Sequence, residues 1–227
     1  MTTAVLGDCM EVMRGLGDGA FDLAICDPPY FWGPNRRGFY GAARSALAVR
    51  RAGYPKTEAW DVVDALYMAE LRRVSRHQIV WGVNYLDFNP GPGRIVWDKV
   101  NGATSYSDCE IAYCSLHDSV RQFRFMWNGM CQGKSVAEGH VMQGNKRLNQ
   151  QRIHPTEKPY ALYHWLLRKY AEPGWKILDT HLGSGSHRIV ADALGFEFLG
   201  IEADVVHFHN QELRFRARRE HNLFSVQ

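Results

Sequence analysis

The stretch "DPPY" at residues 27–30 combines side chains that could hold an amine, and it follows the apolar run "LAIC". The carboxylate of Asp27 can accept hydrogen bonds. The rings of Pro28 and Pro29 fix φ, so the Pro28 carbonyl can be held as a second, rigid acceptor. Tyr30 adds a flat face on which a planar base could stack. A strand that merely ends at two prolines, with an aromatic ring packed beneath it, would have the same residues.

A glycine-containing segment, "DTHLGSGSH" at 179–187, suits a ligand with a nucleotide-like shape. Gly183 and Gly185 stand where a strand turns into a helix, so the backbone can approach a ligand closely at the helix N-terminus. Glu202 ends the next strand, about twenty residues later, where an acid accepts ribose hydroxyls in nucleotide-binding folds. A tight turn and a solvated acid would give the same pattern.

Residues 31–57 concentrate basic charge directly after the "DPPY" stretch and contain no acid. Aromatic residues are interspersed among the basic ones. Basic side chains neutralise phosphates while aromatic rings stack on bases, so this segment is predicted to contact nucleic acid. A solvated loop is the alternative. The predicted nucleic-acid-binding residues are Arg36, Arg37, Arg44, Arg50, Arg51 and Lys56.

Length and composition predict a single domain over residues 1–227, with 45% hydrophobic residues and a net charge of +3. The five cysteines form no Cys-x-x-Cys pair, which favours free thiols over disulfides or a zinc site. The histidines form no recognisable zinc set either, so no metal is expected. No apolar run is long enough for a membrane span, and no signal-peptide core is present, so a cytoplasmic location is expected.

The elements that would position these residues form a mostly parallel, three-layer α/β domain with an antiparallel stretch. The unit 175–204 reads as strand, glycine turn, helix and second strand, a crossover between parallel strands. Alternating residues predict that 108–115 and 120–128 form an antiparallel pair. Further strands are expected at 21–27, 76–83 and 93–100, and helices at 57–74, 159–171 and 203–220.

Three motifs in a fixed order resemble those of one enzyme family: "DPPY" at 27–30, "HPTEKP" at 154–159 and "DTHLGSGSH" at 179–187. They resemble the permuted, or beta-group, DNA amino-methyltransferases that depend on S-adenosylmethionine, in which the catalytic motif precedes the cofactor motif. The resemblance covers most of the chain. It implies a Rossmann-like methyltransferase fold, with a short target-recognition region at about 128–153.

The resemblance also implies roles for individual residues. Asp27 and the Pro28 carbonyl would hold the amine of a flipped base, with Pro29 and Tyr30 completing the catalytic motif. Glu202 would accept the ribose hydroxyls, and Lys158 would lie near the cofactor carboxylate. The full set implied for the cofactor is Asp8, Cys9, Asp27, His154, Thr156, Lys158, Asp179, His181, Gly183, Ser184, Gly185 and Glu202.

The cofactor motif departs from the family pattern. Thr180 and His181 stand where the family has proline and phenylalanine, and Ser186 and His187 stand where it has threonines. The resemblance to the family is therefore weakest at the residues implied for the cofactor.

The implied activity is methyl transfer from S-adenosylmethionine to double-stranded DNA, with S-adenosylhomocysteine as the product and no metal. A motif that begins with Asp, as at Asp27, indicates adenine N-6, whereas Ser there more often marks cytosine N-4. Cytosine N-4 methylation and a non-catalytic cofactor- or DNA-binding module stay open as alternatives. The implied setting is the cytoplasm of a bacterial or phage-infected cell, with a homodimer and a partner restriction nuclease left open.

Overall fold

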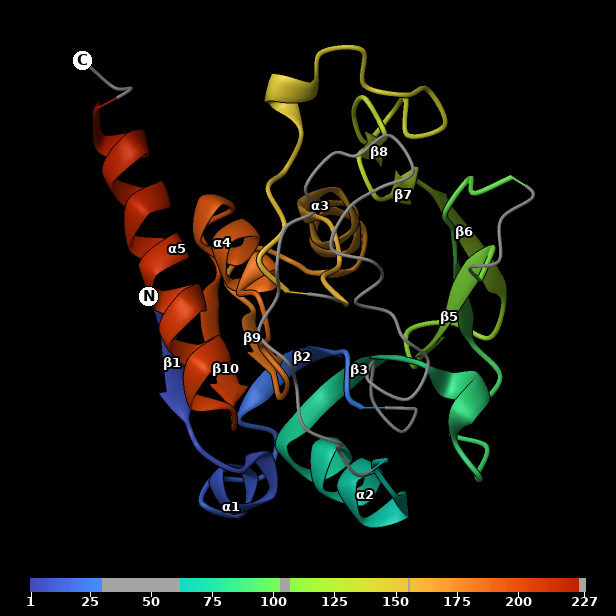
Figure 1. The fold of residues 1–227 in the computed structure, drawn as a ribbon. Coiled ribbons are helices and arrows are strands. Elements are labelled where there is room, and N and C mark those ends of the chain that lie inside the picture. The colour runs from blue at the N-terminus through green and yellow to red at the C-terminus, as the bar shows by residue number, and fades with distance from the viewer. Residues whose placement is uncertain (30–61, 103–106, 155, 225–227) are drawn as a thin grey trace.

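The fold is built around an eight-stranded sheet with the strand order β1-β10-β9-β2-β3-β5-β4-β6 (Figure 1). The computed structural model describes residues 1–29, 62–102, 107–154 and 156–224. The strands of this sheet are β1 (Thr2–Leu6), β2 (Phe21–Cys26), β3 (Ser75–Trp81), β4 (Arg94–Asp98), β5 (Cys109–Cys114), β6 (Val120–Arg124), β9 (Lys176–Asp179) and β10 (Glu197–Glu202).

The sheet is parallel except at β5, which runs antiparallel to both of its neighbours, β3 and β4. The predicted mostly parallel sheet with an antiparallel stretch is therefore confirmed. The predicted pairing of 108–115 with 120–128 is wrong. Because β3 and β4 occupy both edges of β5, β6 pairs instead with the open edge of β4, and this pairing is parallel.

The segment 120–128 is also not one strand. β6 ends at Arg124, and Trp127–Asn128 forms β7, which pairs with β8 (Cys131–Gln132) in a separate two-stranded sheet. The side chain of Arg124 forms an ion pair with Asp98 at 2.9 Å, which ties the end of β6 to β4.

α2 to α5 agree with the predicted helices except at their ends, whereas α1 was not predicted. Residues 57–61 of the predicted helix 57–74 lie outside the described residues. α2 begins at Ala65, because the side chain of Asp64 accepts the N–H of Tyr67 at 3.0 Å and caps the helix. α5 continues beyond residue 220 to Phe224. The helices are α1 (Cys9–Arg14), α2 (Ala65–Val74), α3 (Tyr160–Tyr170), α4 (Ser186–Ala193) and α5 (Val205–Phe224), with 3-10 turns at η2 (Val83–Tyr85) and η3 (Lys146–Leu148).

Successive side chains of β2 point to opposite faces of the sheet, and helices cover both faces, so the fold has three layers. Leu23 and Ile25 are fully buried on the face covered by α3 and α4. Ala24 and Cys26 are fully buried on the opposite face, against α1 and α2. A strand that is buried on both faces is expected in a sheet with helices on each side. Figure 1 shows this arrangement, with α5 packed beyond α4 and β10.

The sheet order brings three acidic residues to one edge. β10, β9 and β2 are adjacent parallel strands, so their carboxyl ends lie side by side. Asp179 ends β9, Glu202 ends β10, and Asp27 directly follows β2. The predicted crossover from β9 through α4 to β10 is confirmed, and it places the glycine turn at the same edge. This edge is where ligands of open α/β sheets bind.

Candidate active site

A pocket of about 310 Å³ opens at the carboxyl ends of β2, β9 and β10. Its volume is at the lower end of the range for small-molecule sites, about 300–1,000 Å³. Pro28 and Pro29 line it, beside most of the predicted cofactor residues: Asp8, Cys9, Asp27, His154, Thr156, Lys158, His181, Gly183, Ser184 and Glu202. Asp179 and Gly185, which were also predicted, are not among the lining residues. Tyr30 lies outside the described residues.

Asp27 is held by a lysine from the distant "HPTEKP" segment. Oδ2 of Asp27 forms an ion pair with Nζ of Lys158, whose side chain is only 2% exposed. Nζ of Lys158 is also 3.0 Å from Oε2 of Glu110, on β5. The second oxygen of Asp27, Oδ1, is buried and has no hydrogen-bond partner among the described residues. Lys158 thus fixes one oxygen of Asp27, while the other oxygen is an acceptor that receives no hydrogen bond from the described residues.

The three charged groups shift one another's pKa values. Burial raises the pKa of Asp27 to about 6, against the opposing effect of Lys158. Burial also raises the pKa of Glu110, but Lys158 and Lys99 outweigh it and hold that pKa at about 2. At neutral pH both acids are therefore anionic. Asp27 gains a proton in mildly acidic solution, whereas Glu110 stays charged.

The glycine turn is held by Glu202. Oε2 of Glu202 accepts the N–H of Gly183 at 2.7 Å, and Oε1 accepts the N–H of Asp204 at 2.9 Å. Gly183 and Gly185 have φ angles of +52° and +72°, a conformation that favours glycine. A carboxylate has about four acceptor sites, so Glu202 can still accept ribose hydroxyls.

The unusual residues of the cofactor motif form their own hydrogen-bond network. The carboxylate of Asp179 accepts the backbone N–H of His181 at 3.0 Å and lies 2.9 Å from Nδ1 of His187. The hydroxyl of Thr180 is 2.6 Å from the hydroxyl of Tyr67 and 2.9 Å from Nδ1 of His181. The departures from the family pattern therefore stabilise the turn. Asp179 directs its oxygens at the protein rather than into the pocket.

The histidines of the pocket are uncharged near neutral pH. Burial lowers the pKa of His181 to about 4 and that of His154 to about 3. The ring of His154 is 4.2 Å from that of His207, edge to face. Lys158 is then the one cation among the described lining residues, and it already pairs with Asp27. The lining also contains several carboxylates, so the pocket favours a ligand that carries positive charge.

Glu157 anchors the segment that carries Lys158, a role that sequence reasoning missed. Oε1 of Glu157 accepts hydrogen bonds from Arg214 at 2.8 Å and from Gln150 at 2.6 Å. Its backbone oxygen accepts the indole N–H of Trp127 at 2.7 Å. These contacts fix the loop between η3 and α3, so Lys158 can reach Asp27. Glu110 was also missed, although it is the one charged residue within the apolar strand Cys109–Cys114.

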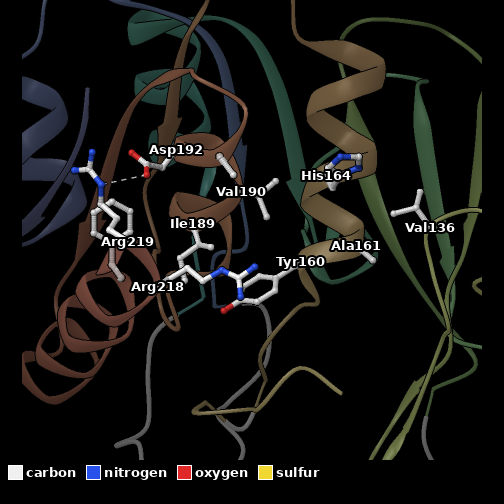
Figure 2. Close-up of a pocket in the computed structure, with 11 residues that line it drawn as sticks. Val136, Tyr160, Ala161, His164, Ile189, Val190, Asp192, Arg218 and Arg219 are labelled. Atoms are coloured by element: carbon white, nitrogen blue, oxygen red, sulfur yellow. Dashed lines mark ion pairs between the residues drawn. The ribbon is translucent and has the colours of Figure 1, made fainter. Parts of the chain in front are cut away.

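A second cavity of about 310 Å³ lies between α3, α4 and α5 (Figure 2). Its lining includes Tyr160 of α3, Ile189 of α4 and Arg218 of α5. Arg219 forms an ion pair with Asp192 beside it, at 3.5 Å. None of the predicted catalytic or cofactor residues lines this cavity, so the pocket at the strand ends is the candidate active site.

Of the two regions predicted to contact DNA, the structure describes only the second. The basic segment 31–57 lies outside the described residues. The region 128–153 contains β8 and η3 and exposes Met130, Met142 and Leu148. Within the described parts of the chain, no three metal-binding side chains come together. No helix in those parts is both long and apolar enough to cross a bilayer.

Comparison with known proteins identifies similar sequences and folds. A DNA methylase family model, N6_N4_Mtase, matches residues 49–209. The type II methyltransferase M2.DpnII of Streptococcus pneumoniae is 36% identical, over 96% of this chain and 91% of its own length. The type II methyltransferase M.HinfI of Haemophilus influenzae is 22% identical, over 95% of this chain and 68% of its own length.

Two solved structures share the fold at low sequence identity. M1.HpyAVI in complex with SAM has a TM-score of 0.53 and 16% identity, and the match covers 94% of this chain and all of the other. The cytosine-N4-specific PvuII DNA methyltransferase has a TM-score of 0.54 and 12% identity, covering 94% of this chain and 86% of the other.

Proposed function

Because the chain belongs to the N6/N4 family of DNA methylases, we propose that it transfers a methyl group from S-adenosylmethionine to N-6 of a flipped adenine in double-stranded DNA. The observation that carries the proposal is the buried Oδ1 of Asp27, an acceptor without a partner among the described residues, in a pocket at the strand ends. An amine N–H is a donor that would satisfy such an acceptor. The motif "DPPY", which begins with Asp27, supports adenine over cytosine.

The pocket residues fit S-adenosylmethionine. The cofactor would supply a methyl group on a sulfonium, whose carbon–sulfur bond breaks as the carbon–nitrogen bond forms, with the electron pair left on sulfur. Glu202 would accept the ribose hydroxyls, and Gly183 lets the backbone approach, since a Cβ there would have no atom nearer than 4.0 Å. The carboxylates of the lining favour the positive sulfonium over a neutral ligand.

Asp27 would act on the amine before and during transfer. Its Oδ1 accepts one amine hydrogen and the Pro28 carbonyl accepts the other, which localises the nitrogen lone pair toward the methyl carbon. The amine becomes positive as the new bond forms, and the anionic carboxylate stabilises that charge. The excess proton passes from nitrogen to Oδ1 and then to water. Alignment of the reacting atoms alone can lower the barrier by about 7–11 kcal/mol.

Replacement of Glu202 by alanine is expected to raise the dissociation constant of S-adenosylmethionine about tenfold to a hundredfold. The change removes a charge-assisted acceptor, worth about 1.5–3 kcal/mol, and releases the N–H of Gly183. Isothermal titration calorimetry measures the constant. Glu197→Ala is the control, because Glu197 begins the same strand and is 54% exposed at its side chain. Equal affinity in both variants would contradict the placement of the ribose.

Transfer of a tritiated methyl group to unmethylated bacterial DNA tests the activity. The proposed enzyme incorporates label into DNA in proportion to its concentration, and unlabelled S-adenosylhomocysteine competes with the reaction. A module that only binds the cofactor or DNA would show binding in titrations with both but no incorporation.

A further inference from the structure

Behind Asp27, a row of charged side chains joins three parts of the sequence that lie far apart. Lys158 Nζ contacts Oδ2 of Asp27 and lies 3.0 Å from Oε2 of Glu110. The other oxygen of Glu110, Oε1, is 2.5 Å from Nζ of Lys99. Positive and negative charges therefore alternate along the row Lys99, Glu110, Lys158 and Asp27. The row begins at Lys99, directly after β4, passes through Glu110 on β5 and ends at the pocket.

Burial of these charges costs free energy, which argues against a purely structural role. The side chain of Lys158 is 2% exposed, and those of Glu110 and Asp27 are 20% and 17% exposed. Desolvation of buried ions costs several kcal/mol for each ion, and apolar side chains of similar volume stabilise a core as well or better. A buried row of charges that ends on a carboxylate of the pocket lining indicates a role at that carboxylate.

We infer that Lys158 and Glu110 are positioning residues for Asp27: Lys158 fixes Oδ2, so that Oδ1 faces the amine, and Glu110 holds Lys158 in that place. This inference rests on the proposed function. It gives Lys158 a protein partner at the catalytic carboxylate, in addition to the place near the cofactor carboxylate implied by the family resemblance. The indole ring of Trp81, the last residue of β3, lies 5.5 Å from Nζ of Lys158.

The charges that face Asp27 determine how its titration responds to each replacement. Lys158 lowers its pKa, while Glu110 on β5 and Asp179 on β9 raise it. Tyr163 on α3 and Cys26 on β2 stay protonated, because burial raises the pKa of each. Removal of the Glu110 charge should therefore lower the pKa of Asp27, and removal of the Lys158 charge should raise it. Shifts of opposite sign show that both charges act on the Asp27 carboxyl, and the rate of methyl transfer then shows whether they position it.

The test is a pH titration of the Asp27 carboxyl carbon by NMR, in the full chain without DNA or cofactor, with Asp27→Asn to assign the signal. Glu110→Gln is expected to move the midpoint to lower pH, and Lys158→Gln to higher pH. Glu197→Gln, an exposed residue far from the site, should leave it in place. If Lys158→Gln does not fold, the direction of the midpoint shift in Glu110→Gln alone tests the inference.

Single-turnover methyl transfer provides the second readout. Glu110→Gln is expected to lower the pKa of Asp27, so Asp27 is anionic at pH 8 in that variant as in the wild type, and a loss of rate reports its placement. Glu110→Gln is expected to slow transfer about 100-fold, the size of effect that a small misplacement produces. The inference would be overturned if Asp27→Asn is inactive but Glu110→Gln leaves both the Asp27 midpoint and the rate of transfer near their wild-type values. Wild-type transfer by Asp27→Asn would instead show that another group holds the amine, and absence of methyl transfer by the wild-type chain would overturn the proposed function itself.

Discussion

Replacing Asp27 by asparagine is expected to lower the rate of methyl transfer about 1,000-fold while leaving the affinity for S-adenosylmethionine near the wild-type value. Asparagine keeps the shape of the side chain but removes the negative charge that stabilises the amine as the bond forms. Loss of one such preorganised group costs about 100- to 1,000-fold. Asp27 also loses its ion pair with Lys158, which places the effect at the upper end of that range.

Single-turnover kinetics with labelled cofactor measure this effect, and calorimetry measures cofactor affinity in the same preparation. Asp18→Asn is the matched control, because the side chain of Asp18 is 82% exposed and pairs with Arg73 on the surface. Normal cofactor binding with wild-type transfer by Asp27→Asn would show that another group holds the amine.

Replacement of Arg36, Arg37, Arg50 and Arg51 by glutamine is expected to weaken DNA binding strongly and to spare cofactor binding. These residues follow the catalytic motif in sequence and have no acid within their segment. If all four contact phosphates of duplex DNA, the slope of log affinity against log salt becomes shallower by about 0.9 for each lost contact, or ~3–4 in total.

Fluorescence anisotropy over a salt series measures that slope. The control replaces Arg76 and Arg121, which are exposed near the amino ends of β3 and β6, at the opposite edge of the sheet from the pocket. An unchanged slope in the fourfold variant would mean that the segment 31–57 is solvated in the complex. The DNA surface would then have to include the region 128–153.

The sequence predicted the acidic edge of the sheet because its signals are local. Asp27, Asp179 and Glu202 each follow a short apolar run, and parallel strands bring such ends together whatever their order. The crossover at 175–204 was predictable for the same reason, since its strand, glycine turn and helix are continuous in sequence.

The network behind Asp27 was not predictable from local patterns. Glu110 reaches Lys158 only because β5 inserts between β3 and β4, and alternation within a strand does not specify its partners. The same lack of information led to the wrong pairing of 108–115 with 120–128. Lys158 was recognised through its motif, but its contact with Asp27 joins residues that are far apart in sequence.

Mass spectrometry of nucleosides from methylated DNA tests the central claim most directly. Unmethylated DNA is incubated with the protein and S-adenosylmethionine carrying a heavy methyl group, then digested to nucleosides. The account predicts that the label appears as N6-methyldeoxyadenosine and is lost with Asp27→Asn. Label found in N4-methyldeoxycytidine, or in no nucleoside at all, would contradict it.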